Sequence, residues 1–380
     1  MYGRPRPLVL GSLGVIILAG AACGPAEPPL PAFLEHAWNT YKHTYVHSDG
    51  YVLDPNRGDG EATSEGQGYL LLRAAWLRDE ATFQRAFEWT ERHLRRTDGL
   101  YSWSWSPRAG GQVLDANTAT DADQEIALAL ILASRAFERP DLIDRARDLL
   151  TAIRRYESIQ TPGGWFPAAG NWAVADRVVN LSYFLPYAYP TFSHIDPEGD
   201  WVTAIQTGYA LIASVLRQPD VRLIPDFMTV TEEGEAAPLP DGSPLSGDFT
   251  SDAMRVYWRI AVDCHLHQRT NACADPLGVK HLTALLARDG RLFTNYATDG
   301  SPLERTESVS FYAMALPFLL THAPAAAHAV RTQRLSASVL DDVTTRTDRY
   351  YDANWVWFGL AAADDMNREA PTYLWLVRDP

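Results

Sequence analysis

Three carboxylates each open a long apolar segment of this chain. Glu65 lies at the start of TSEGQGYLLLRAAW, Asp121 of ATDADQEIALALILA, and Asp252 of SDAMRVYWRIAVD. If these three helix starts meet at one end of the fold, acids far apart in sequence share one cleft. Inverting hydrolysis of a glycoside uses such a set: one carboxylic acid protonates the leaving oxygen, and one carboxylate deprotonates a water. The sequence therefore predicts an enzyme, with Glu65 as general acid and Asp252 as general base.

A structural interpretation of Glu65 is that it complements the helix dipole in a capping box that starts at Ser64. A helix N-terminus favours the charged carboxylate, so burial or a neighbouring acid must keep a proton donor neutral. Asp121 is the natural neighbour. Gly66 and Gly68 lower the helix propensity of this first turn. Glycine at these positions is explained if another group must approach the helix closely there.

The residues next to the other two acids also allow two interpretations. Arg255 follows Asp252 by three positions and could form an ordinary i, i+3 ion pair. The same guanidinium would hold Asp252 ionised, as a base for water requires. Thr120 and Asp123 can form a capping box, which leaves Asp121 free to bind sugar hydroxyls. We therefore expect Asp123 to be structural.

Aromatic residues are abundant, with 12 Trp and 17 Tyr. Aromatic faces stack on the C–H faces of pyranose rings, although tryptophans in a loop can also pack as the loop's own core. The candidate sugar contacts lie in the long loops or near helix starts: Gln67, Trp103, Trp105, Trp165, Tyr183, Arg255, Tyr312, Tyr351 and Asn354.

Apolar residues recur at helical spacing over about twelve segments. The predicted helices are 29–43, 62–78, 80–96, 118–138, 140–157, 179–194, 197–216, 250–266, 274–288, 305–323, 334–346 and 350–363. Strand signals are few and confined to loops.

The connections between these helices alternate in length. Joints near 79, 139 and 195 are tight, whereas 44–61, 97–117, 158–178, 217–249 and 289–304 are long. Even-numbered helices are also apolar on every side, which indicates burial. An all-α (α/α)6 toroid follows, with six inner and six outer helices. Its inner helices begin at the face with the long loops, where the three acids lie.

The N-terminus carries Arg4 and Arg6 before an apolar run from residue 8 to 22, which is short for a bilayer span but suits a signal peptide. Cys23 in LAGAACG approximates a lipoprotein cleavage box, and ordinary cleavage there stays open. We predict a signal peptide over 1–22, a Pro-rich linker over 23–32 and a single domain over 33–380. The protein is then exported, as a periplasmic, secreted or lipid-anchored protein.

The formal net charge of −14 argues against nucleic-acid partners. Cys264 and Cys273 could form a disulfide in an oxidising compartment or remain two thiols. His265 and His267 lack a fourth ligand at recognisable spacing, so no metal is predicted. No phosphate loop, dinucleotide fingerprint or nucleophile elbow occurs, and no cofactor is expected. A monomer that binds a β-linked polysaccharide or oligosaccharide is predicted.

At the three acidic motifs the chain resembles glycoside hydrolase family 8, which contains inverting endoglucanases, chitosanases, lichenases and xylanases. SEGQGY, ATDADQEIALALILAS and SDAMRVYWRIAVD carry the resemblance, and WSW, NLSYFLP and YYDANWVWFGLA extend it over residues 30–365. The resemblance implies an (α/α)6 barrel without metal or organic cofactor. It also implies Glu65 as general acid, Asp121 as ligand of the sugar at the cleavage site, and Asp252 as general base.

The chain departs from the family pattern near the predicted base. NLSYF replaces Asn-Pro-Ser-Tyr, Tyr257 stands where proline is common, and Ser251 replaces an aromatic residue. The leading hypothesis is an exported inverting endo-β-1,4-glucanase that acts on cellulose or mixed-linkage glucan. The alternatives are a chitosanase or xylanase on the same scaffold, or a non-catalytic glycan-binding lipoprotein.

Overall fold

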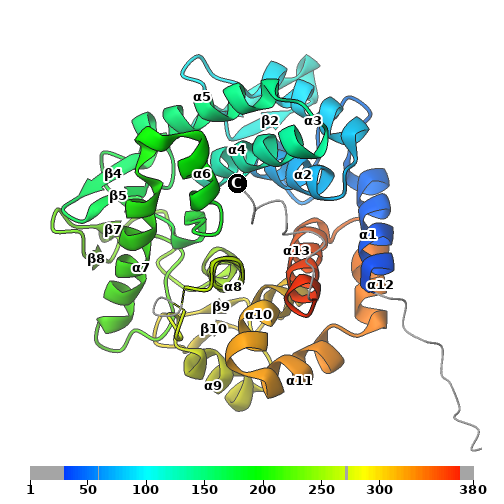
Figure 1. Ribbon diagram of the computed structural model, residues 1–380. Coiled ribbons are helices and arrows are strands. Elements are labelled where there is room, and N and C mark those ends of the chain that lie inside the picture. The colour runs from blue at the N-terminus through cyan, green and yellow to red at the C-terminus, as the bar shows by residue number, and fades with distance from the viewer. Residues whose placement is uncertain (1–29, 59, 270–272, 369–380) are drawn as a thin grey trace, which may run out of the picture.

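The fold is a ring of helices in two layers, seen along its axis in Figure 1. It comes from a computed structural model that describes residues 30–58, 60–269 and 273–368. The predicted signal peptide and Cys23 lie outside these residues. The last residues of the predicted linker, 30–32, already belong to the first helix.

The inner layer consists of helices that are apolar on nearly every side. They are α2 (Ser64–Trp76), α4 (Thr120–Ala136), α6 (Tyr189–Ile195), α8 (Ser251–His267), α10 (Val309–His322) and α13 (Tyr350–Met366). Neighbouring inner helices pack on one another, as α2 does on α4 and α10 on α13. Because these helices have little polar surface to show to water, they are stable only when covered all round.

The outer layer covers them with amphipathic helices. These are α1 (Leu30–Tyr45), α3 (Glu80–His93), α5 (Asp141–Tyr156), α7 (Trp201–Arg217), α9 (Val279–Asp289), α11 (Pro324–Arg334) and α12 (Ala337–Thr345). Helix α5, for example, buries its leucines and Ile153 and turns its aspartates and Arg147 outward. The predicted (α/α)6 toroid is confirmed, and the described part of the outer layer holds one helix more than the six expected.

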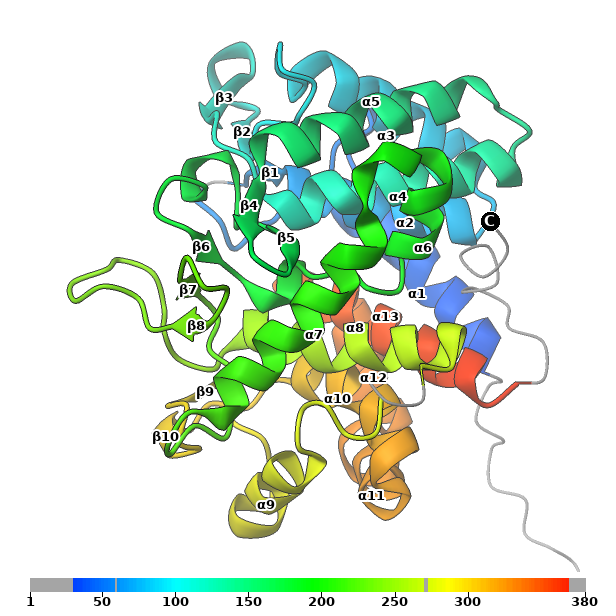
Figure 2. The same cartoon turned by 60° about the vertical axis from the view of Figure 1, so that its left-hand side comes forward.

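Short antiparallel strands lie together at one end of the barrel (Figure 2). Their bounds are β1 (Ala62–Thr63), β2 (Ser104–Ser106), β3 (Gln112–Asp115), β4 (Ser158–Thr161), β5 (Gly164–Pro167), β6 (Val178–Val179), β7 (Met228–Val230), β8 (Ala236–Ala237), β9 (Asn295–Tyr296) and β10 (Pro302–Glu304). Most lie in the predicted long loops, but β1 and Val179 of β6 fall in segments predicted as the helices 62–78 and 179–194. In one sheet Thr63 pairs with Ser104, and Ser104 with Asp115, which ties the start of α2 to the approach to α4.

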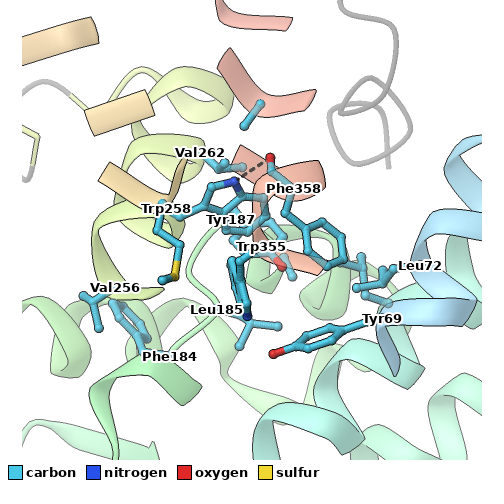
Figure 3. Close-up of a cluster of buried hydrophobic side chains, with 14 of the residues drawn as sticks. Tyr69, Leu72, Phe184, Leu185, Tyr187, Val256, Trp258, Val262, Trp355 and Phe358 are labelled. Atoms are coloured by element: carbon cyan, nitrogen blue, oxygen red, sulfur yellow. Dashed lines mark hydrogen bonds between the residues drawn. The ribbon is translucent and has the colours of Figure 1, made fainter. Parts of the chain in front are cut away.

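An aromatic cluster lies among the inner helices (Figure 3). Trp258 donates its indole N–H to the carbonyl oxygen of Phe358 at 2.9 Å. The ring of Trp355 lies edge-on to those of Tyr69 and Trp258, with centroids 5.6 and 5.8 Å apart. Such edge-to-face pairs fix ring orientation as well as burying area. The cluster therefore locks α2, α8 and α13 together below their N-terminal turns.

The helix predicted over 179–194 is wrong in its first half. The chain there forms a 3-10 turn over Leu181–Tyr183 and an irregular stretch, and α6 begins only at Tyr189. Pro186 and Pro190 explain the break, because proline lacks a backbone N–H and clashes with the preceding turn inside a helix. Pro190 is accommodated because it lies in the first turn of α6, where that N–H would be unpaired.

Helix α11 was missed between the predicted segments 305–323 and 334–346. Its sequence, PAAAHAVRTQR, begins with a proline in the first turn and is rich in alanine, both of which favour a helix. These signals were available in the sequence, but the segment lacks the strong apolar periodicity on which the predictions were based.

A disulfide joins Cys264 in the last turn of α8 to Cys273, with the Cα atoms 5.7 Å apart. The sequence had left pairing and free thiols open, and the structure contains the pair. In the part of the chain that the structure describes, no helix combines the length and the apolar character needed to cross a membrane.

Candidate active site

Glu65, Asp121 and Asp252 lie in the first turns of α2, α4 and α8, at the barrel end that carries the strands. Helices α2 and α4 begin at Ser64 and Thr120, the residues expected to cap them, so each cap lies one residue earlier. The N-cap positions are Thr63, Ala119 and Thr250, so Ser64, Thr120 and Ser251 are first-turn residues. The capping boxes expected at Ser64 and Thr120 are therefore wrong. Thr63 caps α2 by accepting the N–H of Gly66 at 3.0 Å.

One guanidinium joins the three acids. Arg255 donates from Nη1 to Glu65 Oε1 and to Asp121 Oδ2, the latter at 3.2 Å. It donates from Nη2 to Asp252 Oδ1 at 2.7 Å. The Arg255 side chain is only 1% exposed, so these contacts are little screened by water. The predicted meeting of the three helix starts is confirmed, and the ion pair of Asp252 with Arg255 belongs to a larger cluster.

The three acids differ in their access to solvent. The side chains of Glu65 and Asp252 are 28% and 27% exposed, whereas that of Asp121 is 1% exposed. Burial raises the pKa of Asp121 well above its usual range, the nearby Arg255 opposes the rise, and the charge of Glu65 adds to it. Glu65 and Asp252 can therefore meet a ligand from solvent, while Asp121 lies beneath them as a carboxyl that holds its proton readily.

Two side chains that the sequence analysis did not single out complete the hydrogen bonding of the acids. The Tyr69 hydroxyl donates to Glu65 Oε1 at 2.8 Å. Tyr69 lies one turn after Glu65 on the same helix face, so its spacing could have indicated this contact. Asn180 donates from Nδ2 to Asp252 Oδ2 at 2.8 Å across 72 residues of sequence. No local pattern could have paired them.

Two predicted tyrosines lie around the acid cluster. The Tyr183 ring faces the Arg255 guanidinium with 5.6 Å between its centroid and the guanidinium carbon. Burial, followed by the charges of Asp121 and Asp252, raises the pKa of Tyr183. The Tyr351 hydroxyl donates to the carbonyl oxygen of Ser251 at 3.2 Å, beside Asp252. Both tyrosines are half-buried, and both border the site.

Trp103 lies beside the start of α2. Its carbonyl oxygen accepts the N–H of Ser64 at 2.9 Å, one residue before Glu65. The Arg57 guanidinium lies over its ring, 4.6 Å from the centroid. Trp103 is half-buried, so part of the side chain remains accessible at the rim of the site.

Trp105 and Trp165 do not face the site, which corrects the prediction for both. Trp105 is 5% exposed and packs edge-on against Trp89 in the core. The strand register shifts between Ser104 and Trp105, so the alternation that would place Trp103 and Trp105 on one face is broken. Trp165 is 6% exposed, packs on Trp201 and donates to the carbonyl oxygen of Gly199 at 3.0 Å. Both are packing residues of their loops.

Gln67, Asn354 and Tyr312 also have structural partners instead of positions at the cluster. Gln67 is fully buried and accepts the N–H of Val52 at 2.8 Å. Asn354 is fully buried and accepts from Arg73. Tyr312 accepts the N–H of Leu292 at 3.0 Å and donates to Glu307. A buried side chain with satisfied hydrogen bonds has no group to offer a sugar, so these predicted contacts are corrected as well.

A second buried ion pair lies one helical turn below the acid cluster. Arg259 follows Arg255 by four residues and donates to Glu125 at 2.8 Å, and Glu125 follows Asp121 by four residues. Burial raises the pKa of Glu125 to about 7, while Arg259 opposes the rise. Glu125 is also the group that approaches Gly68 closely, as the sequence analysis expected for this glycine. A Cβ on Gly68 would lie 3.3 Å from the Glu125 side chain.

Comparisons with known proteins show the family of this chain. Residues 15–364 match the family described as glycosyl hydrolases family 8. A probable endoglucanase of Novacetimonas hansenii is 32% identical over 66% of this chain and 73% of its own. An endoglucanase of Xanthomonas axonopodis pv. citri is 30% identical over 72% of this chain and 71% of its own. The crystal structure of an endo-1,4-D-glucanase from Vibrio fischeri ES114 shares the fold, with a TM-score of 0.74 at 23% identity over 87% of this chain and 94% of that one. This chain is a glycoside hydrolase and belongs to glycosyl hydrolases family 8.

Proposed function

We propose that the protein is an exported, inverting endo-β-1,4-glucanase that hydrolyses cellulose or mixed-linkage β-glucan. The observation that carries the proposal is the Arg255 guanidinium, which holds two solvent-accessible acids, Glu65 and Asp252, through different nitrogens. An inverting reaction needs an acid and a base on opposite faces of one sugar. The relatives named endoglucanase support a β-glucan as the substrate.

In this mechanism Glu65 protonates the glycosidic oxygen. Its Oε1 already accepts from Tyr69 and Arg255, so the side chain is oriented before substrate arrives. Bound sugar displaces water from the cleft, and loss of water favours the neutral carboxylic acid over the carboxylate. The proton then goes to the leaving oxygen as the bond from that oxygen to the anomeric carbon breaks.

Asp252 removes a proton from the water that attacks the anomeric carbon. Arg255 and Asn180 each hold one of its oxygens, which fixes the plane of the carboxylate. The remaining lone pairs can accept from water. The half-buried Tyr183, which borders the cluster, can orient that water.

Asp121 and Trp103 hold the sugar in this proposal. Asp121 lies beneath the acid and the base on the same guanidinium, and its carboxyl is proposed to bond a hydroxyl of the ring that is cleaved. Trp103 offers an accessible aromatic surface beside Glu65 on which a neighbouring ring can stack.

The decisive test combines two isosteric variants. We expect D252N and E65Q each to lower kcat on β-glucan by about 10²- to 10⁴-fold with unchanged circular dichroism. E65Q alone should recover activity on 2,4-dinitrophenyl β-cellobioside, because that leaving group needs no proton. D144N, which changes an exposed aspartate on α5, is the control. Near-normal turnover by D252N would remove Asp252 from the mechanism.

The substrate and the stereochemistry need separate measurements. Reducing-end release from carboxymethyl cellulose, barley glucan, xylan and chitosan distinguishes the glucanase from a xylanase or chitosanase. Proton NMR during the first turnovers should show the α-anomer at the new reducing end. Initial formation of the β-anomer would contradict inversion.

The proposal includes export and a monomer. The charged and apolar N-terminal residues support cleavage near Cys23. Fractionation of cells that produce the wild type and C23A, followed by mass spectrometry of the mature N-terminus, tests export and lipid attachment. Multi-angle light scattering of the mature protein tests the monomer.

A further inference from the structure

Asp226 binds the N-terminus of the helix that carries Asp252. It lies just before β7, is 3% exposed, and is 24 residues from the helix start in sequence. Its Oδ1 accepts the backbone N–H groups of Thr250 and Ala253, both at 2.9 Å. Its Oδ2 accepts from the Thr250 hydroxyl at 2.5 Å. Three bonds from the first turn of α8 thus end on one distant carboxylate.

This cap differs from those of the other two acid-bearing helices. Helix α2 is capped by the uncharged hydroxyl of its own Thr63, and α4 has no side-chain cap bond. At α8 the side chain of the N-cap Thr250 does not cap the helix but donates to Asp226. A neutral hydroxyl would satisfy a first-turn N–H as well. Capping alone therefore does not explain a second carboxylate beside Asp252.

We propose that Asp226 is the positioning residue of Asp252: it fixes the turn that carries the base, and its negative charge makes Asp252 a stronger acceptor of the proton from water. This inference rests on the proposed function, in which Asp252 is the general base. The backbone of Asp226 is itself held, because its N–H donates to the carbonyl oxygen of Asp248 at 2.7 Å.

The groups around Asp252 explain why a second negative charge, that of Asp226, is useful there. Arg255 bonds Asp252 directly, Asn180 bonds its other oxygen, and Tyr183 and Tyr351 border it. Arg255 also holds Glu65 on α2 and Asp121 on α4.

A guanidinium in contact makes a carboxylate a weaker base, and a nearby negative charge works against this effect. Asp226 supplies that charge from the side of the preceding loop. Burial, followed by the charge of Asp252, raises the pKa of Asp226 to about 6, so the group is ionised at neutral pH.

The variant D226N separates charge from capping. Its amide oxygen can still accept the two N–H groups, and the Thr250 hydroxyl can rotate to accept from the new NH₂. We expect kcat on soluble glucan at neutral pH to fall by about 10-fold with little change in KM. In the wild type kcat/KM should fall near pH 6, where Asp226 takes up its proton and its charge is lost. D226N has no such step, so its acid limb should lie at lower pH by about 0.5 to 1 unit. D241N, an exposed aspartate of the same loop, should match the wild type.

Two further experiments test the role of Asp226 if D226N does not fold or if turnover cannot be measured. If D226N does not fold, T250V removes the hydroxyl donor that lowers the pKa of Asp226. Asp226 then takes up its proton at higher pH, and the acid limb should move to higher pH. Carboxyl NMR of protein with ¹³C-labelled aspartate, with the Asp252 signal assigned through D252N, follows the titration of Asp252 without turnover.

Absence of hydrolysis of any β-glucan by the wild type would overturn the proposed function, and the NMR titration would still decide the role of Asp226. An unchanged acid limb and unchanged kcat, or an Asp252 titration that does not move in D226N, would overturn the role of Asp226.

Discussion

Arg255 donates from Nη2 to Asp252 Oδ1 at 2.7 Å within one turn of the same helix. Its other terminal nitrogen donates to Glu65 on a different helix. Because a guanidinium is planar and rigid, the two carboxylates cannot change their separation independently while both contacts last. The distance between an acid and a base is what an inverting glycosidase must control. Arg255 is therefore central to the geometry of the site.

Replacing Arg255 by lysine should separate charge from geometry. Lysine keeps the positive charge, but a single ammonium group cannot reproduce the two-sided contact with Glu65 and Asp252. We expect R255K to lower kcat by about 100-fold and the free energy of unfolding by about 1 to 3 kcal/mol. The loss of stability is expected because the acids of the cluster lose hydrogen bonds that offset the cost of burying their charge. Steady-state kinetics and urea unfolding measure both. R288K, a half-exposed arginine paired with Asp289, should change neither, and a near-normal kcat for R255K would contradict the proposed role.

Removing the aromatic ring of Trp103 should weaken substrate binding more than turnover. The residue borders the site through its carbonyl oxygen, which accepts the N–H of Ser64, and its ring lies against the Arg57 guanidinium. We expect W103A to raise KM for long cello-oligosaccharides by about 10-fold, or ~1.4 kcal/mol, with a smaller change in kcat. W103F should lie between W103A and the wild type because it keeps a stacking surface. Equal KM values for the three proteins would exclude Trp103 from sugar binding.

The two glycines that flank Gln67 should respond differently to alanine. A Cβ at Gly66 would collide with the Tyr350 hydroxyl and lie 3.0 Å from Val52 Cγ1, whereas a Cβ at Gly68 meets its nearest atom at 3.3 Å. We expect G66A to cost about 1 to 3 kcal/mol of stability and to lower kcat, because the turn that carries Glu65 must shift.

G68A is the matched comparison for G66A. It should stay within about 1 kcal/mol of the wild type, because the gain in helix propensity offsets the tighter contact. Thermal unfolding of the two variants, with kinetics at saturating glucan, tests the difference. Equal stability of the two variants would show that the Tyr350 contact is easily relieved.

Glu157 should make the protein less stable as the pH rises. It is fully buried, accepts from the Thr118 hydroxyl, and lies beside Asp123. Burial raises the pKa of Glu157 from its ordinary value of 4.5 to about 7. Between these values the folded protein binds more protons than the unfolded chain, so the free energy of unfolding falls with increasing pH.

The variant E157Q tests this dependence. Its neutral amide can still accept from Thr118. In the wild type we expect the free energy of unfolding to fall by about 1 to 3 kcal/mol between pH 5 and pH 8 because of Glu157, and E157Q should not show this fall. Urea unfolding of both proteins across that range gives the difference. Parallel curves for wild type and E157Q would show that Glu157 titrates alike in both states.

The helices and the three acids were accessible from local sequence. Helical periodicity depends on residues within a few turns, and an acid in a first turn can be recognised from its neighbours. Glu65, Asp121 and Asp252 could therefore be placed at helix starts, and the alternation of loop lengths placed those starts at one end. The expectation that Asp123 is structural is also met, since it accepts the backbone N–H of Tyr101 at 3.0 Å, although its partner is not the predicted one.

The partners of these acids were not accessible in the same way. Asn180 and Asp226 reach Asp252 and its helix from loops 72 and 24 to 27 residues away in sequence. Trp105 turned inward because of a register shift that only strand pairing produces. Each of these contacts depends on how separate elements pack, which no single segment encodes.

What the sequence by itself determined is most of the helices, their order around the barrel, and the end at which the acids gather. Only the tertiary structure decided which side of each inner helix faces the cleft. The physical reason lies in the composition of those helices: α10 and α13 are apolar on all sides, so they have no polar stripe to fix their rotation. Packing against neighbouring helices sets that rotation, and it buried Asn354 against Arg73 while it left Tyr351, three residues earlier, beside Asp252.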